Sequence, residues 1–177
     1  GVANSIAMIF IMFVIGLNQG MQPIAGYNYG AQKYDRMMQV VKLSIITATC
    51  IMFIGWSLAM FAPYYCVRLF TKDPELIQRS IKAISIIMMM YPFIGCQMVI
   101  TNFFQCIGKV KVSIFLSLSR QLLFLLPLLV ILPNFYNVNG VWAAIPTSDF
   151  IAVVVSITIM TIYLRRLKKE QKEYKAI

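Results

Sequence analysis

Five long apolar stretches, joined by short charged connectors, dominate the sequence and limit what it can fold into. They run over residues 2–29, 40–67, 83–107, 112–133 and 140–164. A helix needs about 20 mostly apolar residues to cross the hydrocarbon core of a bilayer, and each stretch reaches that length. We therefore expect an all-α membrane protein with five transmembrane helices over residues 1–164, followed by a basic tail over residues 165–177.

The composition excludes an ordinary soluble domain and argues against nucleic-acid binding. Apolar residues make up 60% of the chain and charged residues only 12%, whereas a typical soluble domain has about 25% charged residues. The net charge is +10, but the basic residues gather at the ends of the expected helices, which is the pattern of membrane topology. Because the first residue is Gly1 and an apolar stretch begins at once, we expect this sequence to be part of a longer chain.

The distribution of lysine and arginine predicts the orientation in the membrane. Successive connectors face opposite sides, and one side carries twelve basic residues against four on the other. Lysine and arginine are enriched in cytoplasmic loops, so the richer side is expected to be cytoplasmic. The twelve are Lys33, Arg36, Lys42, Lys109, Lys111, Arg120, Arg165, Arg166, Lys168, Lys169, Lys172 and Lys175. The chain is thus predicted to be a multi-pass protein of the cell membrane with a cytoplasmic C-terminus.

The sequence offers little for metal binding or catalysis. Its four cysteines form no C-x-x-C pair, and within apolar stretches cysteine behaves as a small hydrophobic residue. Histidine is absent, which removes the most common general base and a frequent zinc ligand. An intramembrane enzyme would need a catalytic pair, such as two acids or a serine with a base. We therefore expect no enzymatic activity, no metal site and no cofactor.

Asp149 is the one acid inside an apolar stretch. It lies nine residues from the expected helix start, roughly 14 Å at 1.5 Å per residue, which is near mid-depth. A charged, unpaired carboxylate at that depth costs several kcal/mol, so we expect Asp149 to be protonated or paired. Three interpretations stay open: an ion-coupling residue in a polar cavity, a hydrogen-bonded residue that locks helices together, or a residue near enough to the outer surface to be hydrated. Arg120, near the start of the fourth stretch, is interpreted as an anchor that reaches the cytoplasmic boundary.

A stripe of polar side chains marks the third stretch. Gln97, Thr101 and Gln105 follow one another at intervals of four residues, which places them on one helix face. Methionine and aromatic side chains near the start of the same stretch would form adaptable apolar walls. The predicted lining of a substrate cavity is Gln22, Met89, Tyr91, Gln97, Thr101, Asn102 and Gln105. Hydrogen bonding between amides of neighbouring helices and ordinary core packing would also explain this pattern.

The segment 16–31 carries a resemblance to a known family. It reads Gly-x-x-Gln-Gly-x-Gln-Pro-Ile-x-Gly-Tyr-Asn-Tyr-Gly-Ala and resembles the signature of the multidrug and toxic compound extrusion (MATE) transporters. Supporting segments follow in matching order: Gly108-Lys109, Ser119-Arg120-Gln121 with Pro127, and Gly140-Val141-Trp142 with Pro146 and Asp149. The resemblance covers nearly the whole chain.

The resemblance implies both a fold and a function. In that family twelve helices form two six-helix lobes, and this chain would supply the last five helices of the second lobe. It implies an antiporter that exports organic, often cationic, compounds in exchange for Na⁺ or H⁺ by alternating access. The implied partners are small organic substrates, the lipid bilayer and the missing N-terminal lobe of the same protein.

Two departures from the family leave the coupling residue open. Some members carry coupling acids on the first and fourth helices of this lobe, but the first is missing here and the fourth, over 83–107, contains no acid. Asp149 is therefore a candidate from its burial and not from the resemblance. Two alternatives also stay open. A flippase for lipid-linked sugars would need several cations in the apolar stretches, where almost none occur, and a non-transporting membrane scaffold or inactive remnant would need none of this chemistry.

Overall fold

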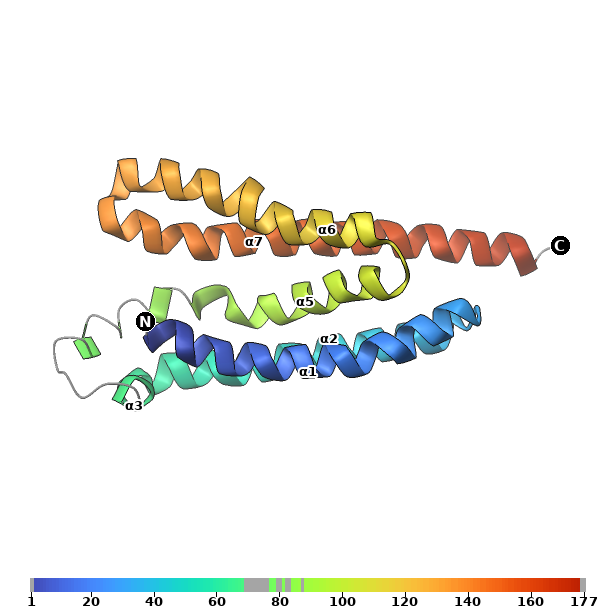
Figure 1. Cartoon of the computed structure of the whole chain (residues 1–177), viewed down its shortest axis with the longest axis horizontal. Coiled ribbons are helices and arrows are strands. Elements are labelled where there is room, and N and C mark those ends of the chain that lie inside the picture. The colour runs from blue at the N-terminus through green and yellow to red at the C-terminus, as the bar shows by residue number, and fades with distance from the viewer. Residues whose placement is uncertain (1, 69–76, 79–80, 82–83, 87, 176–177) are drawn as a thin grey trace.

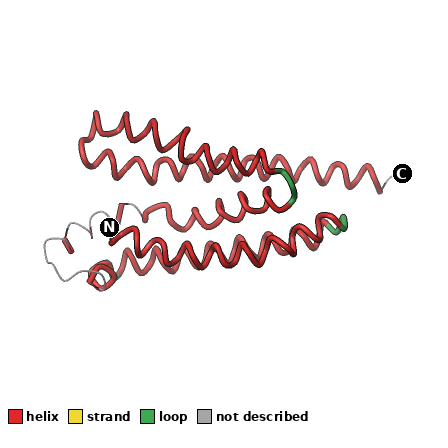
Figure 2. The backbone as a smooth tube through the Cα atoms, viewed as in Figure 1, coloured by secondary structure: helices red, strands yellow, loops and turns green. Residues whose placement is uncertain are grey.

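The computed structural model describes residues 2–68, 77–78, 81, 84–86 and 88–175, and these are helical apart from short turns (Figure 2). The elements are α1 (Val2–Gly30), α2 (Tyr34–Phe61), α3 (Pro63–Arg68), the 3₁₀ helix η1 (Met88–Met90), α5 (Tyr91–Cys106), α6 (Val110–Leu118), the π-helix η2 (Ser119–Leu125) and α7 (Leu126–Lys175). Within the described residues, five helical segments are long and apolar enough to cross a membrane: Ala7–Gly30, Tyr34–Phe61, Ile84–Cys106, Val110–Pro133 and Ala143–Leu167. The expectation of five spans is thus confirmed.

The second span differs from the range expected from the sequence. It was expected over 40–67, whereas α2 begins at Tyr34 and ends at Phe61, and the separate helix α3 follows. The charged residues before position 40 belong to the first two turns of α2, because a helix can extend past its apolar part into polar surroundings. The end at Phe61 follows from Pro63, which disfavours the helical conformation in the residue before it. Accordingly, Ala62 has φ −131° and ψ 44°.

The last two spans form a hairpin, although the helical conformation continues without a break from α6 through η2 into α7. Figure 1 shows the chain running out along α6 and returning along α7, so the direction reverses within the first part of α7. Gly140 marks the return: a Cβ atom added there would lie 2.9 Å from the nitrogen of Pro133 and would also meet the carbonyl of Leu132. A side chain at this position would therefore separate the two arms of the hairpin.

The turns after α1 and α5 have the same hydrogen-bond pattern. After α5, Lys109 donates to the carbonyl of Phe104 at 2.9 Å, and Gly108 takes a left-handed conformation with φ 78°. After α1, Lys33 donates to the carbonyl of Asn28 at 2.8 Å, and the residue in the left-handed conformation is Gln32, with φ 56°. Both are Schellman motifs, which usually place glycine at the left-handed position. The first of these turns along the chain therefore contains a strained non-glycine residue.

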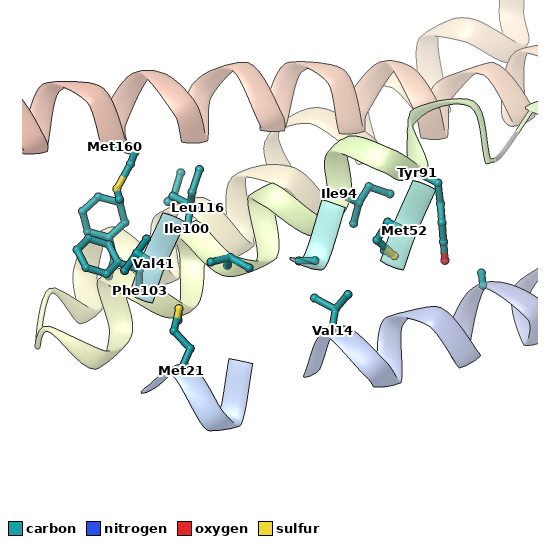
Figure 3. Packing of buried hydrophobic residues seen from close by; sticks show 14 of the residues in the cluster. Val14, Met21, Val41, Met52, Tyr91, Ile94, Ile100, Phe103, Leu116 and Met160 are labelled. Carbon is teal, nitrogen blue, oxygen red and sulfur yellow. The ribbon is translucent and has the colours of Figure 1, made fainter. Parts of the chain in front are cut away.

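The core lies where α5 packs between the α1–α2 pair and the α6–α7 hairpin (Figure 1). Buried side chains from these helices meet along α5, including Val14, Met52, Ile100, Phe103 and Met160 (Figure 3). Gly95 allows α2 and α5 to approach closely, because a Cβ atom there would lie 2.8 Å from the carbonyl oxygen of Ala48. Large apolar side chains such as Met12, Leu43 and Phe61 are exposed on the outer surface, as expected for helices that face lipid.

Candidate functional site

An ion pair joins the last two membrane spans. The Nε atom of Arg120 donates to Oδ1 of Asp149 at 2.7 Å. The Asp149 side chain is 3% exposed, while that of Arg120 is 34% exposed. A carboxylate in a membrane span is costly unless it is neutral or paired. Of the alternatives expected from the sequence, the structure therefore has Asp149 paired.

The pairing corrects the interpretation of Arg120 as a boundary anchor. The fourth span begins at Val110, so Arg120 lies ten residues into it, roughly 15 Å at 1.5 Å per residue. At that depth its guanidinium has a carboxylate beside it and does not depend on the interface for a partner. The partnership of Arg120 with Asp149 is what sequence reasoning missed, and its sequence signal was a cation placed within an apolar stretch.

A π-helix contains Arg120, and a proline precedes Asp149. Arg120 is the second residue of the seven-residue π-helix η2, and Leu126 donates to the carbonyl five residues back, that of Gln121. π-Helical segments are rare in proteins and frequently occur at functional sites. On the facing arm, Pro146 lies three residues before Asp149 and is contained within α7. The arm that carries Arg120 thus departs from regular α-helix at the ion pair, and a proline lies one turn before Asp149 on the other arm.

A small cavity adjoins the ion pair. It has a volume of about 190 Å³ and is lined by Ala7, Ile11, Tyr91, Ile94, Arg120, Ile145 and Asp149. Tyr91 is 4% exposed, and its hydroxyl has no hydrogen-bond partner among the described residues. Figure 3 shows the Tyr91 side chain extending from α5 towards α1. The cavity therefore combines a phenol, a guanidinium and a carboxylate with apolar walls.

The volume of this cavity decides what it can hold. Pockets for drug-sized ligands typically occupy about 300–1,000 Å³, so a cavity of about 190 Å³ is too small for them. A water molecule takes about 30 Å³ in the liquid, so a small ion with a few waters fits. The site thus suits ion or proton binding better than drug binding.

Two of the predicted cavity residues bind each other instead. Nε2 of Gln22 in α1 donates to Oδ1 of Asn102 in α5 at 2.7 Å. Nδ2 of Asn102 donates in turn to the carbonyl of Met98 at 2.9 Å. In this conformation the two amides connect helices, which was the alternative explanation for them.

The remaining predicted substrate contacts do not gather in one place. Gln97 is buried, Thr101 is half-buried and Gln105 is exposed, while Met89 is 58% exposed. Of these, Gln97 stands out because its Oε1 atom has no hydrogen-bond partner among the described residues. Asn18 in α1 shares this property at both of its amide atoms and is 2% exposed. The substrate-contacting role of the predicted stripe stays a prediction.

Comparison with known proteins places this geometry in context. A family model described as MatE matches residues 1–131. The multidrug export protein MepA of Staphylococcus haemolyticus (strain JCSC1435) is 22% identical over 130 residues, which cover 73% of this chain and 28% of MepA. MepA of Staphylococcus aureus (strain MSSA476) is 22% identical over 163 residues, which cover 92% of this chain and 36% of MepA. The chain thus spans about a third of the length of these curated relatives.

Solved structures show the same arrangement of helices. The MATE multidrug transporter DinF-BH matches with a TM-score of 0.82 and 38% identity, over 88% of this chain and 35% of that one. A MATE transporter in complex with MaL6 matches with a TM-score of 0.87 and 21% identity, over 95% of this chain and 38% of that one. The helical bundle described above is therefore a multi-pass membrane fold.

Proposed function

The chain belongs to the MatE family, and from this membership we propose that it is the C-terminal part of a multidrug efflux transporter. The chain, with its five spans, covers about a third of the length of a solved MATE transporter. This share is expected for five helices of the second six-helix lobe of a twelve-helix protein. The proposed transport mechanism is alternating access, in which the two lobes rock around a central cavity. The N-terminal lobe of the same protein is accordingly the chain's main proposed partner.

The observation that carries the proposed ion coupling is the buried ion pair beside its cavity. Export by exchange requires a group within the membrane that binds and releases a cation, either Na⁺ or H⁺. Asp149 has that chemistry, because a cation or proton bound at its carboxylate competes with Arg120 for the same negative charge. Binding would weaken the contact between η2 and α7, and release would restore it. Ion occupancy would thereby be coupled to the packing of the last two spans.

We further propose which surfaces meet the substrate and where the protein lies. Substrates would be organic, often cationic, compounds in contact with the adaptable apolar and amide side chains predicted above. The protein would reside in the cell membrane with its C-terminus in the cytoplasm, on the side rich in lysine and arginine. Apart from the coupling ion, we propose no cofactor, no catalysis and no nucleic-acid partner.

One feature of the site weighs against a flippase for lipid-linked sugars. Such a protein needs uncompensated cations in its cavity to hold a pyrophosphate. Here Arg120, a cation within the described part of the fourth span, is already bound to a carboxylate. A non-transporting scaffold is the other alternative, and it would not need a coupling carboxylate.

The decisive experiment measures dye accumulation in cells that lack their own efflux pumps. The full-length protein containing this chain is compared with its Asp149→Asn variant, using a cationic fluorescent dye. Thr147→Val serves as the matched control, because Thr147 is exposed near Asp149 and, among the described residues, its hydroxyl bonds only the carbonyl of Ala143 within the same helix. Membrane levels of all three proteins are measured in the same cells.

We expect the wild type and Thr147→Val to lower dye accumulation and Asp149→Asn to fail at equal membrane level. If Asp149→Asn exports as well as the wild type, the transporter proposal stands and the coupling role of Asp149 is wrong. If the wild type exports none of a broad panel of dyes and drugs, the proposal of multidrug efflux is overturned.

A further inference from the structure

A second, larger cavity lies at the opposite end of the bundle from the hairpin turn. It has a volume of about 600 Å³ and opens between the first turns of α2 and the part of α7 near residue 165. Its lining combines apolar and charged side chains, among them Asp35, Met38, Lys42, Leu164, Arg165 and Leu167. We call this cavity the α2–α7 groove. Its volume is within the range of about 300–1,000 Å³ that is typical of ligand pockets.

The charges of the α2–α7 groove lie over an apolar floor. Met38 and Leu164 are half-buried and Leu167 is buried, so they form a continuous apolar surface with the core. Lys42 and Arg165 are exposed, and no ion pair involves either of them in the part of the chain that the structure describes. With Asp35 as the one acid in the lining, the groove has an excess of positive charge.

The depth of the groove in the membrane specifies its occupant further. The apolar stretch within α2 begins at residue 40 and the last one ends at residue 164, so Lys42 and Arg165 lie where both spans leave the hydrocarbon. An occupant at this depth has its polar part among the headgroups and its apolar part along the helices. Two unpaired cations at headgroup depth above apolar side chains match the charge and polarity of an anionic lipid.

We propose that the α2–α7 groove binds one anionic phospholipid. Lys42 and Arg165 hold its phosphate, and an acyl chain lies on Met38, Leu164 and Leu167. This site is separate from the ion pair of Arg120 and Asp149 and does not depend on which compounds the protein exports. A soluble phosphate would use the two cations but would leave the apolar floor exposed, so the lipid is the occupant that satisfies both parts of the groove.

The test measures the lipid affinity of the full-length protein containing this chain. A single lipid species is added to the protein in detergent, and the rise in unfolding temperature with lipid concentration reports binding. The probes are dioleoyl phosphatidylglycerol, dioleoyl phosphatidylcholine with the same tails but no net charge, and glycerol 3-phosphate without tails. The groove variant is Lys42→Gln/Arg165→Gln. Its charge-matched control is Arg36→Gln/Lys111→Gln, which removes two exposed cations that do not line the groove.

We expect the wild type to bind phosphatidylglycerol more tightly than phosphatidylcholine, and glycerol 3-phosphate to have no effect. The groove variant should bind phosphatidylglycerol about tenfold more weakly, while the control stays within about twofold of the wild type. All four substituted residues are exposed, so both double variants should unfold at the wild-type temperature in the absence of lipid. This comparison separates a loss of lipid binding from a loss of folding.

Three results would overturn the proposal. Equal losses in both double variants would mean diffuse attraction to positive charge. An equal response of the wild type to both phospholipids would mean that the groove is unselective or is covered by another segment of the full-length protein. Stabilisation by glycerol 3-phosphate as strong as that by phosphatidylglycerol would assign the site to free phosphate compounds. Dye export is measured separately, so failure of the lipid proposal leaves the efflux proposal unaffected.

Discussion

Arg120 Nε and Asp149 Oδ1 lie 2.7 Å apart, and this contact connects η2 with the last membrane span across 29 positions of sequence. The two partners are not equivalent, because Asp149 is almost completely buried whereas a third of the Arg120 side chain is accessible. Loss of the arginine leaves a buried carboxylate without a partner. Loss of the carboxylate leaves a guanidinium inside a membrane span without its partner, but one whose side chain is a third accessible.

This asymmetry predicts unequal effects on stability. Arg120→Gln should lower the free energy of unfolding by roughly 3 kcal/mol, the cost of an uncompensated buried charge. Asp149→Asn should lower it by less, about 1 kcal/mol, because Oδ1 of the asparagine can still accept a hydrogen bond from Nε of Arg120. The combined variant should be more stable than the sum of both changes implies. Unfolding midpoints of the four proteins in detergent measure this, and strictly additive effects would show that the pair does not interact.

The turn after α1 offers a simple gain in stability. Gln32 has φ 56°, a left-handed conformation that costs a residue with a side chain about 1 kcal/mol. Gln32→Gly should therefore raise the free energy of unfolding by up to about 1 kcal/mol. Gly108→Gln in the equivalent turn is the reciprocal variant and should lower it by a similar amount, since Gly108 has φ 78° and open space around it. Paired thermal unfolding curves test both changes, and shifts in the same direction would contradict the backbone explanation.

The close approach of α2 and α5 predicts a clear difference between two glycines. Gly95→Ala should destabilise the protein by about 1–3 kcal/mol, because the new Cβ atom would lie 2.8 Å from the backbone carbonyl of Ala48 and the helices would have to separate. Gly20→Ala should be neutral or slightly stabilising, because nothing lies within 4 Å of a Cβ atom there. Unfolding midpoints of the two variants provide the comparison, and equal midpoints would mean that the contact with Ala48 relaxes without cost.

Much of the fold was predictable because membrane spans depend on length and apolarity. The first stretch, expected over 2–29, is helix α1 over Val2–Gly30. The start of α2 at Tyr34 was not predictable from apolarity, since Asp35 and Arg36 continue the helix outside the apolar part. Likewise, α7 continues through the basic tail to Lys175. Charged residues therefore indicate where a membrane span ends, but the helix itself can continue through them.

The site was predictable only in part. The burial of Asp149 followed from its place in an apolar stretch, but its partner did not, because Arg120 comes next to it only through the hairpin and the π-helix. The stripe of Gln97, Thr101 and Gln105 shows another limit. Residues four apart drift by about 40° around an α-helix, so eight residues move the side chain by about 80°. The first of the three consequently lies in the core and the last on the surface.

The buried amide of Gln97 gives the last prediction. Its side chain is 4% exposed and its Oε1 atom has no hydrogen-bond partner among the described residues. Such a group costs about 1–3 kcal/mol when it stays unsatisfied, so Gln97→Met, which keeps shape and volume, should leave stability unchanged or raise it. If Gln97 serves substrate or ion passage, the same variant should lower dye export despite this stability. Gln121→Met, at an exposed position of η2, is the control and should change neither property. Unfolding midpoints and dye accumulation are measured on the same variants. A stable Gln97→Met variant with reduced export supports a functional role of the amide. A destabilised variant would mean that the Gln97 amide forms hydrogen bonds with groups beyond those described.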